Sequence, residues 1–136
     1  MAPGSNQWRG WVNRRAQSFV HASRGIFLLW LTQWNFRIHV VAGFGAICLG
    51  WYFQIPPTEW LALILAIGLV LSAEALNTAI ERMVDRVEPQ WHPAARDAKD
   101  LAAAGVLIAS LFSFIVGVIL FGSRLVSEAS RLASGH

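Results

Sequence analysis

The stretch that decides the fold reads Ala-Glu-Ala-Leu-Asn-Thr-Ala-Ile-Glu-Arg-Met-Val-Asp and spans residues 73–85. At about 100° per residue, Glu74, Asn77, Glu81 and Asp85 fall on one narrow face of a helix that is several turns long. An apolar run without charge precedes this face. The stretch therefore predicts one helix that carries carboxylates from hydrocarbon toward water.

The composition of the whole chain favours a membrane as its solvent. Of its 136 residues, 55% are hydrophobic and 14% are charged, whereas a soluble domain carries about 25% charged residues. Disorder is excluded because it requires low hydrophobicity. The basic residues are scattered arginines without an aromatic platform, so we expect no nucleic-acid partner. The length of the chain predicts a single domain over residues 1–136, and the composition predicts that this domain is membrane-integral.

Three apolar segments predict an all-α membrane protein with three transmembrane helices, because about 20 apolar residues cross the hydrocarbon layer. The expected spans are about 38–55, 60–82 and 101–123. The second reaches spanning length only if it includes Glu74. Residues 17–34 predict an amphipathic helix at the interface, with a helix packed on the bundle as the alternative. The sequence leaves the order of residues 123–136 open, although their small and polar side chains suggest a frayed end.

Basic residues predict the orientation, because cytoplasmic loops carry an excess of lysine and arginine. Nine of them fall on one side of the predicted topology and two on the other. The nine are Arg9, Arg14, Arg15, Arg24, Arg37, Arg82, Arg86, Arg96 and Lys99, and the two are Arg124 and Arg131. We therefore place the N-terminus and the 82–100 loop in the cytoplasm.

The carboxylates on the second span predict chemistry. Ionisable groups at membrane depth cost at least about 2.5 kcal/mol each, so Glu74 and Glu81 are candidates for function. Carboxylate oxygens beside an amide suit Mg²⁺, which keeps substrate phosphates as further ligands. For Asp85, beyond the span, a solvated helix end is the alternative. Lys99, the only lysine, suits a phosphate as a point charge, and an ordinary cytoplasmic anchor is the alternative.

These motifs resemble the small bacterial membrane-integral kinases that phosphorylate diacylglycerol or undecaprenol. Residues 74–85 are similar to the family pattern E-x-x-N-[ST]-A-[IL]-E-x-x-[VI]-D. A second match begins at His92-Pro93 and runs through Lys99-Asp100 to residue 107, and a third is Asn-Phe-Arg-Ile-His at 35–39. The resemblance covers residues 14–121.

The resemblance implies a homotrimer in the bacterial cytoplasmic (inner) membrane that transfers phosphate from ATP, with Mg²⁺, to a membrane lipid alcohol. By motif position, Glu74 is the catalytic base, and Glu81 is a metal ligand that also contacts the nucleotide. The other implied nucleotide-site residues are Arg14, His21, Gln33, Asn77, Gln90, Trp91, His92, Lys99 and Asp100. Gln33 stands where the family has a glutamate that helps to hold the metal, so Asp85 or Asp100 is a candidate to compensate.

The acceptor and the activity each leave an alternative open. Undecaprenol is slightly favoured over diacylglycerol, because the motifs at 35–39 and 92–95 look more like those of undecaprenol-type members. A member that has lost its activity through Gln33 is one alternative. A non-enzymatic oligomer whose carboxylates line an ion path is another, although such a path requires polar residues across the whole membrane.

Overall fold

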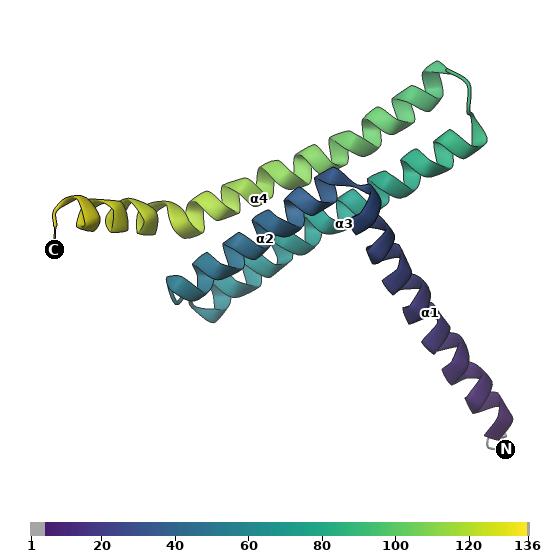
Figure 1. The fold of residues 1–136 in the computed structure, drawn as a ribbon, viewed down its shortest axis with the longest axis horizontal. Helices are drawn as coiled ribbons and strands as arrows, with labels where there is room; N and C mark the ends of the chain where they lie inside the picture. The colour runs from purple at the N-terminus through teal and green to yellow at the C-terminus, as the bar shows by residue number, and fades with distance from the viewer. Residues whose placement is uncertain (1–4, 136) are drawn as a thin grey trace. The chain divides into compact units, whose positions relative to one another are not determined.

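Four α-helices make up the described part of the chain. The computed structural model describes the backbone of residues 5–135 and, among the side chains, those of residue 15 and residues 17–135. The helices are α1 (Ser5–Thr32), α2 (Trp34–Tyr52), α3 (Pro57–Val87) and α4 (Pro93–Ala133) (Figure 1). Residues 5–135 contain no strand, which confirms the predicted all-α fold.

The chain divides into two compact units, Met1–Gln33 and Trp34–His136. The first contains α1, which was predicted over about 17–34. The helix begins at Ser5, twelve residues before the predicted start, and it ends at Thr32, two residues before the predicted end. The prediction relied on the spacing of apolar residues, which begins only near residue 17. The polar residues before them also form a helix, and apolar spacing does not detect it. The position of α1 at a membrane interface stays a prediction.

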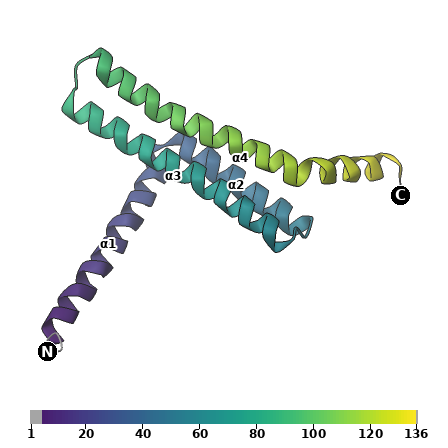
Figure 2. The same cartoon turned by 180° about the vertical axis from the view of Figure 1, so that it is seen from behind.

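In the second unit, α3 is the central helix, and it packs against both α2 and α4 (Figures 1 and 2). A buried cluster lies near the turn between α2 and α3. Its members are Ile55, Leu63, Leu120 and Phe121. A few large apolar contacts therefore fix the three helices at this end.

The turn between α2 and α3 is tight. Gln54 adopts a φ of 48°, and Pro57 is the first residue of α3, where its fixed φ suits a helix start. A Cβ added at Gly50 would lie 2.9 Å from the ring of Trp60. The two helices approach this closely because residue 50 has no side chain.

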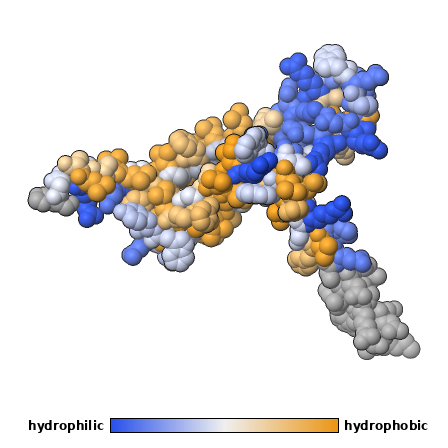
Figure 3. Space-filling model, viewed as in Figure 1, coloured by the Kyte–Doolittle hydropathy of each residue, from blue (hydrophilic) through white to orange (hydrophobic). Residues whose placement is uncertain are grey.

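Most of the large apolar side chains in the second unit point outward. Figure 3 shows hydrophobic residues over the middle of this unit, whereas hydrophilic residues gather where α3 ends and α4 begins. Exposed apolar surface of this extent is unfavourable in water. The surface suits hydrocarbon or contacts with other copies of the chain.

Two of the described helices, α3 and α4, are long and apolar enough to cross a membrane. The predicted first span, 38–55, corresponds to α2, which has 19 residues and does not meet the same test. Its first turns carry Asn35, Arg37 and His39, and these lower its mean hydropathy. The count of three spans therefore stays a prediction.

The fraying suggested for the C-terminal segment is not found over residues 123–133, because α4 continues without a break to Ala133. Arg124 forms an ion pair of 2.9 Å with Glu59 of α3. Tyr52 of α2 donates a hydrogen bond of 3.1 Å to Glu128. These contacts with two other helices stabilise the last turns, which composition alone did not reveal.

Candidate active site

The polar face predicted on α3 becomes more exposed along the helix. Glu74 is 2% exposed and Asn77 is 9% exposed, whereas Glu81 is half-buried and Asp85 is exposed. Because α3 is one unbroken helix over Pro57–Val87, it holds all four groups on one face. The face leads from the interior of the second unit to its hydrophilic end.

Glu74, the predicted catalytic base, lies beside an imidazole from the neighbouring helix. Nε2 of His39, on α2, is 3.3 Å from Oε1 of Glu74. The separation is that of an ion pair, but Oε1 has no hydrogen-bond partner of normal geometry among the described residues. Sequence reasoning quoted His39 as part of a motif and gave it no role. The contact depends on how α2 packs on α3, and no sequence period reveals it.

Asn77 and Glu81 are joined one turn apart. The amide Nδ2 of Asn77 donates a hydrogen bond of 3.0 Å to Oε1 of Glu81. Oδ1 of Asn77 is buried without a hydrogen-bond partner among the described residues. A buried acceptor without a partner is costly. The face therefore offers oxygen atoms to a ligand that donates or carries positive charge.

A cavity of about 450 Å³ lies where α3 ends and α4 begins. It is lined mainly by polar side chains from both helices and the connection between them. Those predicted for the nucleotide site are Gln90, Trp91, His92, Lys99 and Asp100, and Asp85 lines the same cavity. The structure thus brings these five predicted residues to one place.

Ion pairs order the walls of this cavity. Nζ of Lys99 is 2.7 Å from Oδ1 of Asp85, and this hydrogen bond raises the pKa of Lys99, as do the charges of Asp85 and Glu81. Asp100 pairs with Arg96 at 3.5 Å. Both pairs are solvent-exposed, so they contribute little to stability. The two ion pairs instead hold charged side chains in place at the wall of the cavity.

His92 also has a structural task that the sequence reasoning did not assign. Its Nδ1 accepts a hydrogen bond of 3.2 Å from the backbone N–H of Ala94, and Pro93 is the first residue of α4. His92 is therefore the N-cap of α4. The hydrogen bond from Ala94 holds Nδ1 of the imidazole at the start of α4.

The residues predicted to bind metal are not assembled as a closed site. The described residues contain no group of three or more histidine, cysteine, aspartate or glutamate side chains close enough to hold a metal ion. Asp85 is paired with Lys99. Glu81 and the unpartnered oxygen of Asn77 nevertheless have the chemistry that Mg²⁺ prefers. These residues fit an open site that substrate phosphates would complete.

Three predicted site residues belong to the first unit. His21 is exposed and Gln33 is half-buried, at the end of that unit. The side chain of Arg14 lies outside the described residues. The assignments of these residues to the nucleotide or the metal stay predictions.

Residues 20–121 match the sequence profile of the prokaryotic diacylglycerol kinases. The chain belongs to this family. The match confirms the predicted resemblance and the predicted class of enzyme, a lipid kinase, and a kinase of this family takes ATP as its phosphate donor. Membership, together with two helices that are apolar enough to cross a bilayer, also indicates membrane association.

Individual relatives of the prokaryotic diacylglycerol kinase family carry two different names. The chain is 39% identical over 121 residues to the undecaprenol kinase of Bacillus subtilis, which covers 89% of this chain and 98% of the relative. It is 38% identical over 111 residues to the diacylglycerol kinase of Synechocystis, covering 81% of this chain and 63% of the relative. It is 33% identical over 101 residues to the diacylglycerol kinase of Escherichia coli K12, covering 74% of this chain and 83% of the relative.

Proposed function

We propose that this lipid kinase transfers the γ-phosphate of Mg²⁺-bound ATP to the hydroxyl of a membrane lipid alcohol, with undecaprenol favoured over diacylglycerol. One observation carries the proposal. Glu74 is an almost fully buried carboxylate, on the same helix face as the acids that lead to a polar cavity. Burial of a carboxylate is costly, and ionisable residues that are retained at membrane depth usually mark a functional site.

The nucleotide occupies the cavity between α3 and α4. Lys99 has three N–H donors, so it contacts phosphate while it remains paired with Asp85. Trp91, which is exposed, offers an aromatic face to the base. The seven residues from Glu81 to Glu74 span about 10 Å along the axis of α3. A triphosphate that lies along this face reaches from the cavity toward Glu74.

Glu81 and Asn77 would hold Mg²⁺ together with the phosphates, and Gln33 is the further predicted ligand. When bound, the ion neutralises the charge that develops on the transferred phosphoryl group. Phosphoryl transfer depends mainly on such positioning and charge neutralisation. Because Gln33 brings no negative charge, this site would hold Mg²⁺ less tightly than one with a second carboxylate.

Glu74 acts as the general base. The lipid oxygen forms a bond to the γ-phosphorus while the bond from that phosphorus to the leaving oxygen of ADP breaks. The hydroxyl proton moves to the Glu74 carboxylate. A base within hydrogen-bond reach of the hydroxyl contributes about 10²- to 10⁴-fold to such a step.

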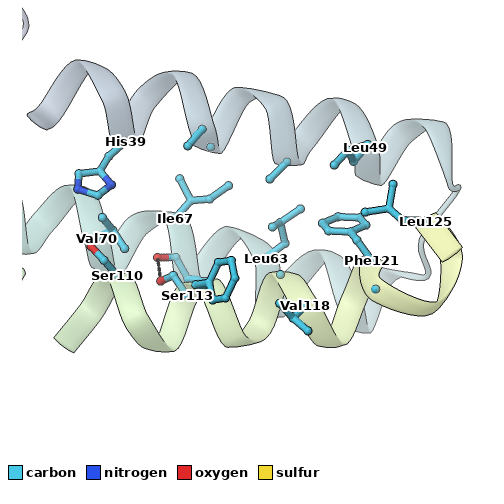
Figure 4. Close-up of a pocket in the computed structure, with 17 residues that line it drawn as sticks. His39, Leu49, Leu63, Ile67, Val70, Ser110, Ser113, Val118, Phe121 and Leu125 are labelled. Carbon is cyan, nitrogen blue, oxygen red and sulfur yellow. Dashed lines mark hydrogen bonds between the residues drawn. The ribbon is translucent and has the colours of Figure 1, made fainter. Parts of the chain in front are cut away.

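The hydrocarbon of the acceptor has a matching place. An apolar groove of about 520 Å³ runs along α2, α3 and α4, with His39 at one end (Figure 4). Because His39 lies 3.3 Å from Glu74, a lipid in this groove would present its hydroxyl beside the base. A groove lined by small and branched apolar side chains suits an isoprenoid tail. The high coverage of the relative named undecaprenol kinase supports the same acceptor.

The proposed assembly is a homotrimer of three-span protomers with cytoplasmic N-termini in the bacterial cytoplasmic membrane. The excess of basic residues on one side supports this orientation. Oδ1 of Asn77 and Oε1 of Glu74 are buried without a hydrogen bond of normal geometry among the described residues, which supports contacts beyond the single chain. A neighbouring protomer would screen these groups from lipid.

The proposal is tested by phosphate transfer from γ-labelled ATP with Mg²⁺ in mixed micelles. Undecaprenol and diacylglycerol are offered separately, and Glu74→Ala is the matched control. We expect label in undecaprenol that is lost in the variant. Label in diacylglycerol alone would overturn the assignment of undecaprenol as the acceptor. No label in either lipid, from folded trimeric protein, would overturn the activity and favour a member that has lost it.

A further inference from the structure

The contact between His39 and Glu74 joins α2 to α3 beside the buried end of the polar face. We propose that His39 is a positioning residue, which orients the Glu74 carboxylate for proton transfer from the lipid hydroxyl. The inference rests on the proposed function. It adds a residue that the motif analysis left without a role.

The geometry places His39 between the groove and the base. Its Nε2 is 3.3 Å from Oε1 of Glu74, and the two side chains are 25% and 3% exposed. Figure 4 shows the imidazole at one end of the groove, where it extends from α2 toward α3. Because His39 lines the groove, a lipid hydroxyl at this end of the groove would lie beside the imidazole that contacts Glu74.

The surroundings of Glu74 leave this task to His39. Asn77, one turn along α3, donates its amide hydrogen to Glu81 instead. Glu81 lies on the same helix face and repels a second negative charge. A buried carboxylate requires a donor or a positive partner, and His39 is the basic group at ion-pair distance from it.

The chemistry requires only a donor at Nε2. The N–H of His39 donates to Oε1, which leaves the second carboxylate oxygen for the lipid hydroxyl. The hydroxyl proton moves to that second oxygen as the new oxygen–phosphorus bond forms and the bond to ADP breaks. His39 keeps its own proton throughout. A contact of 3.3 Å without full hydrogen-bond geometry fits a site without substrate, since such bonds tighten when substrate binds.

The competing explanation is a structural tie between α2 and α3. A tie would lower the unfolding temperature when it is removed and would leave the turnover of the folded protein unchanged. A positioning residue affects kcat and leaves the KM for ATP unchanged, because the nucleotide cavity lies at the other end of the polar face. The two explanations therefore differ in what they predict for the folded enzyme.

The experiment measures label transfer from ATP to lipid for the full chain and two variants of similar side-chain volume. His39→Gln keeps an N–H donor, whereas His39→Leu has none and suits a groove-lining position. Val41→Ala, at a position that is 65% exposed on the same helix, is the control. Circular dichroism and thermal unfolding in detergent measure the folded fraction of each variant.

We expect His39→Leu to lower kcat about 10- to 100-fold, the usual effect of misplacing a reacting group, with the KM for ATP within about twofold. His39→Gln should restore a large part of kcat, and Val41→Ala should match the wild type. If His39→Leu does not fold, His39→Met replaces it. Wild-type kcat in the variant without a donor, or equal losses in both variants, would overturn the proposal. An inactive wild type would refute the proposed function itself. The wild-type sample therefore tests the kinase activity, and the variants test the role of His39.

Discussion

Replacing Glu74 by glutamine isolates the chemistry of the buried carboxylate. Glutamine has the same shape and fills the same site, which is 2% exposed, but it does not accept the hydroxyl proton. Loss of a general base lowers turnover about 10²- to 10⁴-fold, which corresponds to about 2.7–5.4 kcal/mol in the activation free energy.

The structure also predicts what Glu74→Gln leaves unchanged. Glu74 does not line the nucleotide cavity, and 11 residues of helix separate it from Asp85, about 16 Å along the axis. The KM for ATP should therefore stay within about twofold of the wild-type value. The glutamine amide keeps an oxygen that can accept a hydrogen bond from Nε2 of His39, so the thermal stability of the protein should change little.

The assay is the initial rate of label transfer from γ-labelled ATP, measured at saturating lipid over a range of ATP concentrations. Thermal unfolding of the same preparations provides the control for folding. A fall in kcat of less than about tenfold would refute the role of Glu74 as general base. A large rise in the KM for ATP at constant kcat would instead place Glu74 at the nucleotide.

Three further predictions concern the proposed metal ligand, the nucleotide cavity and the apolar groove. Gln33→Glu should lower the Mg²⁺ concentration that gives half-maximal activity, because it adds a negative ligand, and an unchanged midpoint would show that residue 33 is not a ligand. Lys99→Met should raise the KM for ATP about tenfold or more, since charged hydrogen bonds are strong, whereas Arg131→Gln, an exposed ion-pair partner at the other end of α4, should not. Because the hydrogen bond to Asp85 raises the pKa of Lys99, its charge is lost only as pH rises through that raised pKa, and a KM for ATP that increases already across the neutral pH range would contradict its role. Ala46→Phe should fill part of the apolar groove and raise the KM for lipid with an unchanged KM for ATP, and equal lipid kinetics would show that the acceptor lies elsewhere.

Helix positions and the polar face could be predicted from the sequence because both depend on local periodicity. The spacing of Glu74, Asn77, Glu81 and Asp85 repeats with the helix turn, so a continuous α3 was sufficient to align them. The connection from α3 to α4 is short. It therefore brings the segment around Trp91 close to Lys99, which the family motifs had also indicated.

Helix ends were less accessible to sequence reasoning. Polar residues at the start of α1 fit a helix as well as a loop, and the helix begins at Ser5 rather than near residue 17. The end of α4 was misjudged because its order depends on partners distant in sequence. Glu59 and Tyr52 reach Arg124 and Glu128 from other helices.

The sequence by itself determined the all-α class, the acid-bearing helix and the family of lipid kinases, since composition, period and motif spacing are properties of the chain. Only the tertiary structure decided that His39 meets Glu74, that Lys99 pairs with Asp85, and that an apolar groove ends at the imidazole. These features depend on the rotation and register of one helix against another. Packing of side chains sets both, and it joins residues that no repeat in the sequence relates.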